Sequence, residues 1–155
     1  MIIQKANISD APEILSLQKL AYQSEAKIYN DYTIPPLTQT LEEVKEKFED
    51  HIFLKSVENG KIIGSVRGNV MDPETVYIGR LIVHPGHQNQ GIGGKLLDEI
   101  EANFPDFKRF ELITGYKSRK NISFYEKRGY KIFKREKFTD GLYLLYMEKS
   151  ASVSE

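Results

Sequence analysis

The sequence predicts an α/β protein in which helices flank both faces of a central mixed sheet. Tight hairpins dominate the first half of the chain, whereas strand–helix–strand crossovers dominate the second half. The composition is that of an ordinary globular domain, with 40% hydrophobic and 28% charged residues among 155, and no linker divides the chain. We therefore expect a single domain over residues 1–149, followed by a frayed tail at 150–155.

The N-terminal part should form a short strand over residues 2–6 and then two helices. Asp10 is expected to begin the first helix, with Glu13 completing a capping box. Thr40 and Glu43 form a second capping box, which predicts a helix from residue 41. Between the two helices, we expect a loop stiffened by Pro35-Pro36.

Three strands follow, beginning with a hairpin. Residues 52–58 run into Asn59-Gly60, the strongest short hairpin signal, and residues 62–70 return as the partner strand. A third strand is expected over residues 76–83, where Gly79 could mark a bulge.

The second half alternates helices and strands before a closing hairpin. The whole element order is therefore β α α β β β α β α β β, and its last five members are helix 91–103, strand 109–114, helix 118–128 and strands 130–138 and 142–148.

The segment from Gln88 to Gly94 is a glycine-rich turn between a strand and a helix. Helix N-termini leave backbone N–H groups unpaired and attract phosphates. The nucleoside-triphosphate pattern fails because Leu96 follows Lys95, and the dinucleotide pattern fails because its third glycine position is also Leu96.

The remaining pattern, Q-x-x-G-x-G at Gln88, Gly91 and Gly93, resembles the acetyl-CoA signature of the GNAT superfamily of N-acetyltransferases. The preceding strand, which ends in Leu-Ile-Val-His-Pro, is also similar to that family's strand. This resemblance implies a GNAT-like acyl-CoA N-acyltransferase fold with acetyl-CoA as co-substrate. The implied cofactor-binding residues are Leu81, Ile82 and Val83 for the pantetheine arm, and Gln88, Asn89, Gln90, Gly91, Ile92, Gly93 and Gly94 for the pyrophosphate.

Residues 118–130 resemble the family's second motif, N-x-x-A-x-x-L-Y-x-x-x-G-F, with one departure. Ser118 occupies the asparagine position and Asn121 the small-residue position. Both are expected to contact the cofactor, Asn121 because it shares a helix face with Tyr125. By the same resemblance, Tyr125 is the catalytic acid that protonates the departing thiolate.

The base and the acceptor site are less clearly marked. The family's common glutamate position falls on Ile113, so the common base is absent. Glu25, Tyr29 and Asp31 lie in the region that lines the acceptor site in the family, and acidic and aromatic groups suit a cationic amine.

We therefore expect direct acetyl transfer to a primary amine, with a small molecule as the first hypothesis for the acceptor. Two alternatives stay open: acetylation of a protein N-terminus or lysine, and a non-catalytic acyl-CoA sensor. The chain has no cysteine and three histidines, so neither a cysteine nucleophile nor a metal site is expected.

Charge and hydropathy restrict the partners. Lys plus Arg equal Asp plus Glu at 22 each, which argues against a nucleic-acid partner. The sequence shows neither an apolar run long enough to span a membrane nor a signal peptide, so a cytoplasmic protein without a membrane partner is expected. Dimers are frequent in the family that the chain resembles, which makes a homodimer one expectation.

Overall fold

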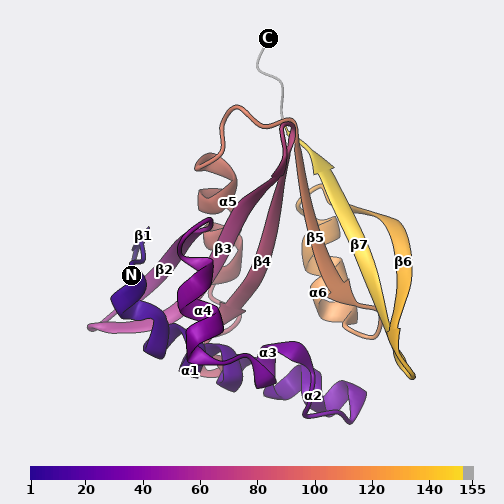
Figure 1. Cartoon of the computed structure of the whole chain (residues 1–155), viewed down its shortest axis with the longest axis horizontal. Helices are drawn as coiled ribbons and strands as arrows, with labels where there is room; N and C mark the ends of the chain where they lie inside the picture. Colours follow the sequence, from indigo (N-terminus) through magenta and orange to yellow (C-terminus); the bar gives the residue numbers. More distant parts are fainter. Residues whose placement is uncertain (152–155) are drawn as a thin grey trace.

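The computed structural model describes residues 1–151, which form a seven-stranded mixed sheet with helices on both faces (Figure 1). The strand order is β1-β2-β3-β4-β5-β7-β6, and only β4 and β5 pair in parallel. The strands are β1 (Ile2–Lys5), β2 (Ile52–Glu58), β3 (Lys61–Asp72), β4 (Thr75–Val83), β5 (Arg109–Gly115), β6 (Lys131–Thr139) and β7 (Leu142–Ser150).

Six α-helices accompany the sheet. They are α1 (Ala11–Ala21), α2 (Gln23–Tyr29), α3 (Pro35–Thr38), α4 (Leu41–Lys47), α5 (Ile92–Ala102) and α6 (Arg119–Glu126). Short 3-10 turns, η1 (Ile8–Asp10) and η2 (Pro85–His87), precede α1 and α5.

Each face of the sheet carries its own core. On one face, fully buried Leu96, Leu97 and Ile100 of α5 pack on the sheet. On the other face, Ile14 of α1 and Val44 of α4 pack on alternate strand residues. The predicted mixed sheet with helices on both faces is confirmed. Each face can hold a core of its own because side chains alternate between the two faces along each strand.

The two parallel strands separate soon after they meet. Only Thr75–Tyr77 of β4 pair with Arg109–Glu111 of β5. Figure 1 shows the two strands meeting at one end and diverging toward the end where α2 and α3 lie. The sheet is therefore open in a V, and the β5-facing edge of Ile78–Val83 has no strand partner within the described chain.

The hairpin and the second capping box form as predicted. Asn59 and Gly60 both adopt positive φ, as a two-residue hairpin turn requires. Thr40 accepts from the Glu43 backbone N–H, and the Glu43 side chain accepts from the Thr40 N–H.

The bulge in β4 is centred one residue after Gly79. Ser65 and Arg67 of β3 pair with Ile82 and Gly79, so β4 has one extra residue between the paired positions. Arg80 lies at this bulge and adopts a positive φ of 49°. Gly79 itself does not adopt a positive φ.

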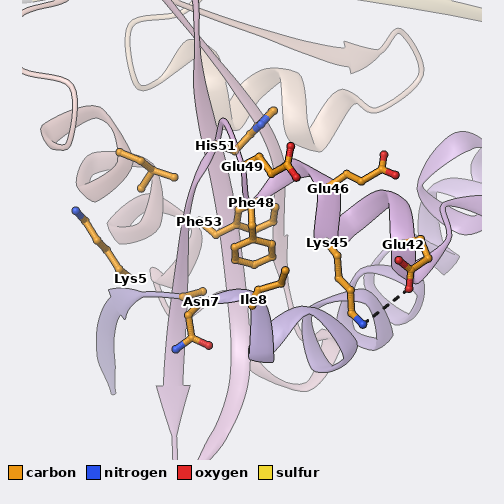
Figure 2. A pocket seen from close by; sticks show the side chains of 12 residues that line it. Lys5, Asn7, Ile8, Glu42, Lys45, Glu46, Phe48, Glu49, His51 and Phe53 are labelled. Atoms are coloured by element: carbon orange, nitrogen blue, oxygen red, sulfur yellow. Dashed lines mark ion pairs between the residues drawn. The ribbon is translucent and has the colours of Figure 1, made fainter.

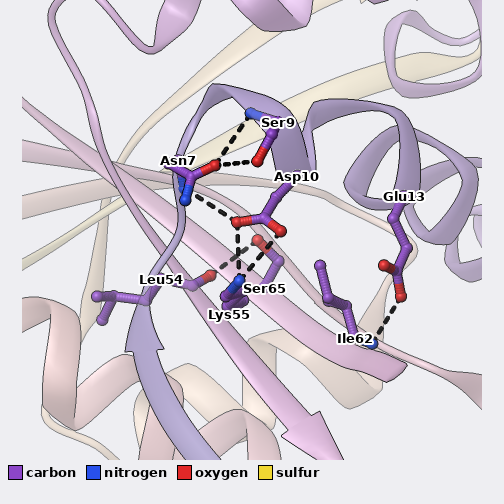
Figure 3. Close-up of polar contacts among 8 residues, drawn as sticks. All are labelled: Asn7, Ser9, Asp10, Glu13, Leu54, Lys55, Ile62 and Ser65. Atoms are coloured by element: carbon purple, nitrogen blue, oxygen red, sulfur yellow. Dashed lines mark hydrogen bonds and ion pairs between the residues drawn. The ribbon is translucent and has the colours of Figure 1, made fainter. Parts of the chain in front are cut away.

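The predicted capping box of Asp10 and Glu13 is wrong. Asn7 is the capping residue: its side chain accepts from the Ser9 N–H, and Asp10 reaches back to the Asn7 N–H (Figure 3). Asp10 also binds Lys55 at 2.9 Å, while Glu13 accepts from the Ile62 N–H at 2.7 Å. Both carboxylates thus bind strand residues, Asp10 on β2 and Glu13 on β3. The capping box that forms, between Asn7 and Asp10, lies three residues earlier than the predicted one.

The loop expected before Thr40 is largely helical. It contains α2 and α3, and the αL conformation of Asn30 ends α2. Gln18 of α1, which is 1% exposed, holds α3 by donating to the Pro36 carbonyl and to the Gln39 side chain, both at 2.9 Å. No pattern in the sequence indicated that the polar side chain of Gln18 would be buried and bind α3.

The expected frayed tail begins too early. Ser150 pairs with Arg109 at the end of β7, and the Ala151 N–H donates to the Lys108 carbonyl at 2.7 Å. Residues 152–155 of that predicted tail lie outside the described residues. Within residues 1–151, no helix has the length and apolar character that crossing a membrane requires.

Candidate functional site

A cleft of 960 Å³ occupies the open V between β4 and β5. Helices α1, α2, α3 and α6 and the glycine loop complete its walls. The cleft brings together most of the predicted site residues, namely Glu25, Tyr29, Leu81, Ile82, Val83, Gln88, Asn89, Gly91, Ile92, Gly93, Gly94, Ser118, Asn121 and Tyr125.

Two predicted residues do not line the cleft. Gln90 is an exposed loop residue. The Asp31 carboxylate turns back onto its own loop, where it accepts from the Thr33 N–H at 2.8 Å and from the Thr33 hydroxyl at 2.6 Å. The Asp31 carboxylate is thus used in a local turn, and Asp31 does not line the cleft in which Glu25 and Tyr29 lie.

The three glycines of the loop differ in what an added Cβ would meet. Gly91 is the N-cap of α5 with φ of 78° and open space beside it. A Cβ on Gly93 would only touch the Phe124 ring at an ordinary 3.4 Å. A Cβ on Gly94 would lie 2.3 Å from the Arg128 guanidinium, so Gly94 makes room for that side chain.

Arg128 was missed by the sequence reasoning, although it lines the cleft. Its guanidinium lies over the Phe124 ring at 4.0 Å and donates to the Phe124 carbonyl at 3.2 Å. Together with the unpaired N–H groups at the start of α5, this cation makes the loop region a fitting place for a pyrophosphate.

The free edge of β4 faces the same cleft. Leu81, Ile82 and Val83 belong to the part of β4 that is paired with β3 on one side and unpaired with β5 on the other. Backbone donors and acceptors on this edge need a partner when they are removed from water. An extended, amide-containing pantetheine arm matches that need.

The Tyr125 side chain lies against the Phe124 and Tyr130 rings and lines the cleft. Burial raises the pKa of the Tyr125 phenol well above its usual value, and the neighbouring Tyr22, Tyr77 and Glu25 act in the same direction. The phenol therefore remains protonated across the neutral pH range and keeps a hydrogen to donate.

Glu25 is held on α6 by the two residues that were predicted to contact the cofactor. Ser118, which is 2% exposed, donates from its hydroxyl to Glu25 Oε2 at 2.5 Å. Asn121 donates from Nδ2 to Glu25 Oε1 at 3.2 Å. Ser118 is the N-cap residue of α6, but its side chain makes no capping hydrogen bond and donates to Glu25 instead.

Tyr29 fastens the other end of α2 to the same segment. Its hydroxyl accepts from the Lys117 N–H at 2.8 Å and lies 3.5 Å from the Ser118 hydroxyl. A Cβ on Gly115 would lie 2.1 Å from the Tyr29 hydroxyl, so this contact requires a glycine there. Burial raises the pKa of Tyr29.

Among the described residues that line the cleft, Glu25 is the only carboxylate. Ile113, which holds the family's common base position, also lines the cleft but has no proton-accepting group. Glu111, two residues earlier in β5, is buried and paired with Arg109 at 2.9 Å, so it is used in the sheet.

The two histidines beside the loop have structural partners. His84 Nδ1 accepts from the Gly86 N–H at 2.9 Å, and His87 Nε2 lies 3.2 Å from Glu58. Neither contact involves Tyr125 or Glu25, and both stabilise the turn that leads into α5.

A second hollow of 630 Å³ lies away from the V, where β1, α4 and β2 meet (Figure 2). Its lining includes Phe48 and Phe53, whose rings stack at 3.9 Å, and a rim of mixed charge. None of the predicted site residues lies in it. The chemistry-bearing side chains therefore concentrate in the cleft of the V.

The model described as the acetyltransferase (GNAT) family matches residues 13–130. The UPF0157 protein YqkA of Bacillus subtilis (strain 168) is 29% identical over 142 residues, which cover 92% of this chain and 40% of that protein. The chain thus spans less than half the length of this curated relative.

Solved structures share the fold over nearly the whole chain. The structure of smu.2055 from Streptococcus mutans UA159 has a TM-score of 0.83 at 19% identity and covers 97% of this chain and 99% of that chain. The PaiA N-acetyltransferase of Thermoplasma acidophilum, in complex with coenzyme A, has a TM-score of 0.79 at 19% identity and covers 97% and 98%. At such identities the likeness shows the fold alone.

Proposed function

Because the chain belongs to the GNAT acetyltransferase family, we propose that it transfers an acetyl group from acetyl-CoA directly to a primary amine of a small molecule. The observation that carries this proposal is the meeting of Tyr125 and Glu25 in one cleft, between the glycine loop and α2. This arrangement supplies a proton donor and a proton acceptor beside a phosphate-binding turn.

The cofactor side of the reaction rests on the loop and the free β4 edge. The pyrophosphate binds the start of α5 near Arg128, and the pantetheine arm pairs with the backbone of Leu81–Val83. Backbone N–H groups of this edge polarise the thioester carbonyl and stabilise the negative charge that develops on its oxygen. Asn121 and Ser118 contact the arm from α6.

The acceptor side rests on Glu25. A protonated amine is attracted to this carboxylate and gives it a proton, after which the neutral nitrogen attacks the thioester carbon. The tetrahedral intermediate collapses with cleavage of the carbon–sulfur bond. Glu25 passes its first proton to solvent and takes the second proton from the nitrogen. Tyr125 donates a hydrogen bond and then a proton to the departing thiolate, and it recovers a proton from solvent.

A small acceptor is favoured over a peptide because α3 lies at the cleft. Pro35 and Pro36 are among its lining residues, and Gln18 holds the segment in place. A folded, anchored segment at the acceptor side narrows the space that an extended peptide would need.

The test is a panel of amines and peptides with detection of the free CoA thiol. We expect CoA release that depends on a small primary amine, with the acetylated amine as the second product. Peptide-dependent release alone would favour protein acetylation. Tight acetyl-CoA binding without release for any acceptor would favour the sensor function.

A further inference from the structure

Two arginines without carboxylate partners lie near Gly79 of β4, and one of them, Arg80, lines the cleft. Arg67 of β3 and Arg80 of β4 take part in none of the ion pairs formed within residues 1–151. Arg67 is 8% exposed, and its Nε lies 3.9 Å from where a Cβ on Gly79 would stand. The protein thus holds two positive charges near Gly79 and Arg80 without neutralising them.

Arg80 is placed there by an unfavourable backbone conformation. It occupies the β4 bulge with φ of 49°, a region that side chains other than glycine and asparagine rarely adopt. Its Nε is buried and has no hydrogen-bond partner. A buried donor of a charged group without a partner is costly, and an anionic ligand in the cleft would offset that cost by supplying the partner.

The surroundings of Arg80 belong to the acceptor side. Tyr22, at the junction of α1 and α2, and Tyr77 of β4 both line the cleft, and the Arg80 charge opposes the burial-driven rise in the pKa of each phenol. Arg67 stacks over Phe53 in the core beneath α1 and α4. The pyrophosphate side has its own arginine, Arg128, beside Gly94.

Glu25 lies near the same phenol. Its charge acts on Tyr22 with the opposite sign to that of Arg80, so a carboxylate and a guanidinium are both close to one side chain of the acceptor site. We propose that the acceptor is an amine that also carries a carboxylate, of the amino-acid class, with its amine facing Glu25 and its carboxylate bound by Arg80. The inference rests on the proposed function and specifies its substrate.

The chemistry of this pairing is specific. A guanidinium binds a carboxylate through two parallel N–H···O bonds, and the Tyr22 and Tyr77 hydroxyls can donate to the same anion. Arg67, behind Arg80, adds positive potential without needing to touch the ligand. The arrangement also selects against acceptors that carry a second positive charge.

The test compares common α-amino acids with their α-carboxamides, using CoA release and acetyl-CoA in excess. The wild-type protein should show kcat/KM at least about tenfold higher for the acid, as expected for one charge-assisted pair. Arg80→Gln should bring the ratio of acid to amide toward one and leave the KM for acetyl-CoA unchanged. Arg135→Gln, an exposed β6 arginine outside the cleft lining, is the matched control and should keep the wild-type ratio.

The outcomes separate the inference from the proposed function. CoA release with amines that do not prefer a carboxylate, or an Arg80→Gln variant that weakens acetyl-CoA binding instead, would overturn the inference alone. If no amine gives CoA release, the proposed function fails. Calorimetry that compares the binding of N-acetylglycine and N-acetylglycinamide then tests whether Arg80 forms a carboxylate-binding site. If only the acid binds and this binding is lost in Arg80→Gln, the carboxylate site is supported. If the acid and the amide bind equally well, the carboxylate site is excluded.

Discussion

The Glu25 carboxylate accepts the Ser118 hydroxyl across 93 residues of sequence, and this contact joins α2 to the start of α6. Residues of both helices line the cleft, so the hydrogen bond joins two of its walls. Glu25 therefore both links the two helices and supplies a carboxylate to the cleft. Binding of a pantetheine arm to Ser118 or Asn121 would compete with these hydrogen bonds and release the carboxylate for the amine.

Replacing Glu25 by glutamine should remove the proton acceptor while keeping a hydrogen-bond acceptor for Ser118. We expect kcat to fall by about a hundredfold or more, with little change in the melting temperature. Steady-state kinetics with the preferred amine provides the measurement. Glu42→Gln, on the exposed side of α4, serves as the control, and full turnover in Glu25→Gln would remove the carboxylate from the mechanism.

Replacing Tyr125 by phenylalanine removes one hydroxyl and keeps the ring contacts with Phe124 and Tyr130. We expect kcat to fall about a hundredfold, while the dissociation constant for acetyl-CoA stays nearly constant. Tyr146→Phe is the matched control, because Tyr146 bonds Glu136 and lies outside the cleft lining. An unchanged kcat in Tyr125→Phe would exclude the phenol as the acid.

Replacing Gly115 by alanine should detach α2 from the β5–α6 connection. The new Cβ would overlap the Tyr29 hydroxyl and displace it from the Lys117 N–H. We expect a loss of stability of about 1–3 kcal/mol and a higher KM for the amine. Tyr29→Phe should reproduce part of both effects, at about 1 kcal/mol. Thermal unfolding and steady-state kinetics would reveal the loss, and wild-type values in Gly115→Ala would contradict the role of this contact.

His51 should make the stability depend on pH between neutral and mildly acidic conditions. Burial lowers the pKa of His51, although the Asp50 carboxylate 2.6 Å away opposes that effect. As pH falls through the ordinary histidine value of about 6.5, the unfolded chain takes up a proton that the folded protein still refuses. Stability is therefore full above that pH and decreases below it. Melting temperatures from pH 8 to about pH 5 should fall less steeply in His51→Gln than in the wild type, and parallel curves would contradict this assignment.

Asn7, and not Asp10, should be the residue whose loss uncaps the N-terminal helical segment. Asn7→Ala removes the acceptor for the Ser9 N–H and should lower the free energy of unfolding by about 1 kcal/mol. Glu13→Gln keeps an oxygen for the Ile62 N–H and should cost less. Urea denaturation distinguishes the two; an unchanged stability in Asn7→Ala would contradict the capping role of Asn7.

The local parts of the fold and the cofactor loop were predictable because their signals lie within a few residues. Asn59-Gly60 needs only its own two positive φ angles, and Thr40 with Glu43 needs one helical turn. The glycine loop likewise depends on the strand and helix that border it. The end of the last strand was less predictable, because Ser150 pairs with Arg109 of β5 and extends β7 beyond the expected residue 148.

The acceptor half of the site could not be read in the same way. Asp31 and Glu25 look equivalent in the sequence, since both are acidic residues of one polar segment. One turns onto Thr33 and the other crosses to α6, because only Glu25 lies on a helix that faces Ser118 and Asn121. Gln90 belongs to the same predicted pyrophosphate loop as Gln88, yet only Gln88 lines the cleft.

The sequence by itself determined the glycine-rich turn at Gln88–Gly94 and the strands and helices around it, because hydrogen bonding and side-chain periodicity over a few residues specify such elements. Only the tertiary structure decided that Glu25 is the carboxylate in the cleft, that Arg128 fills the space beside Gly94, and that Arg80 lies next to Arg67. Those pairs come from strands and helices far apart in the chain. Their contacts depend on how the sheet splays and which helix covers it, and no local pattern encodes that geometry.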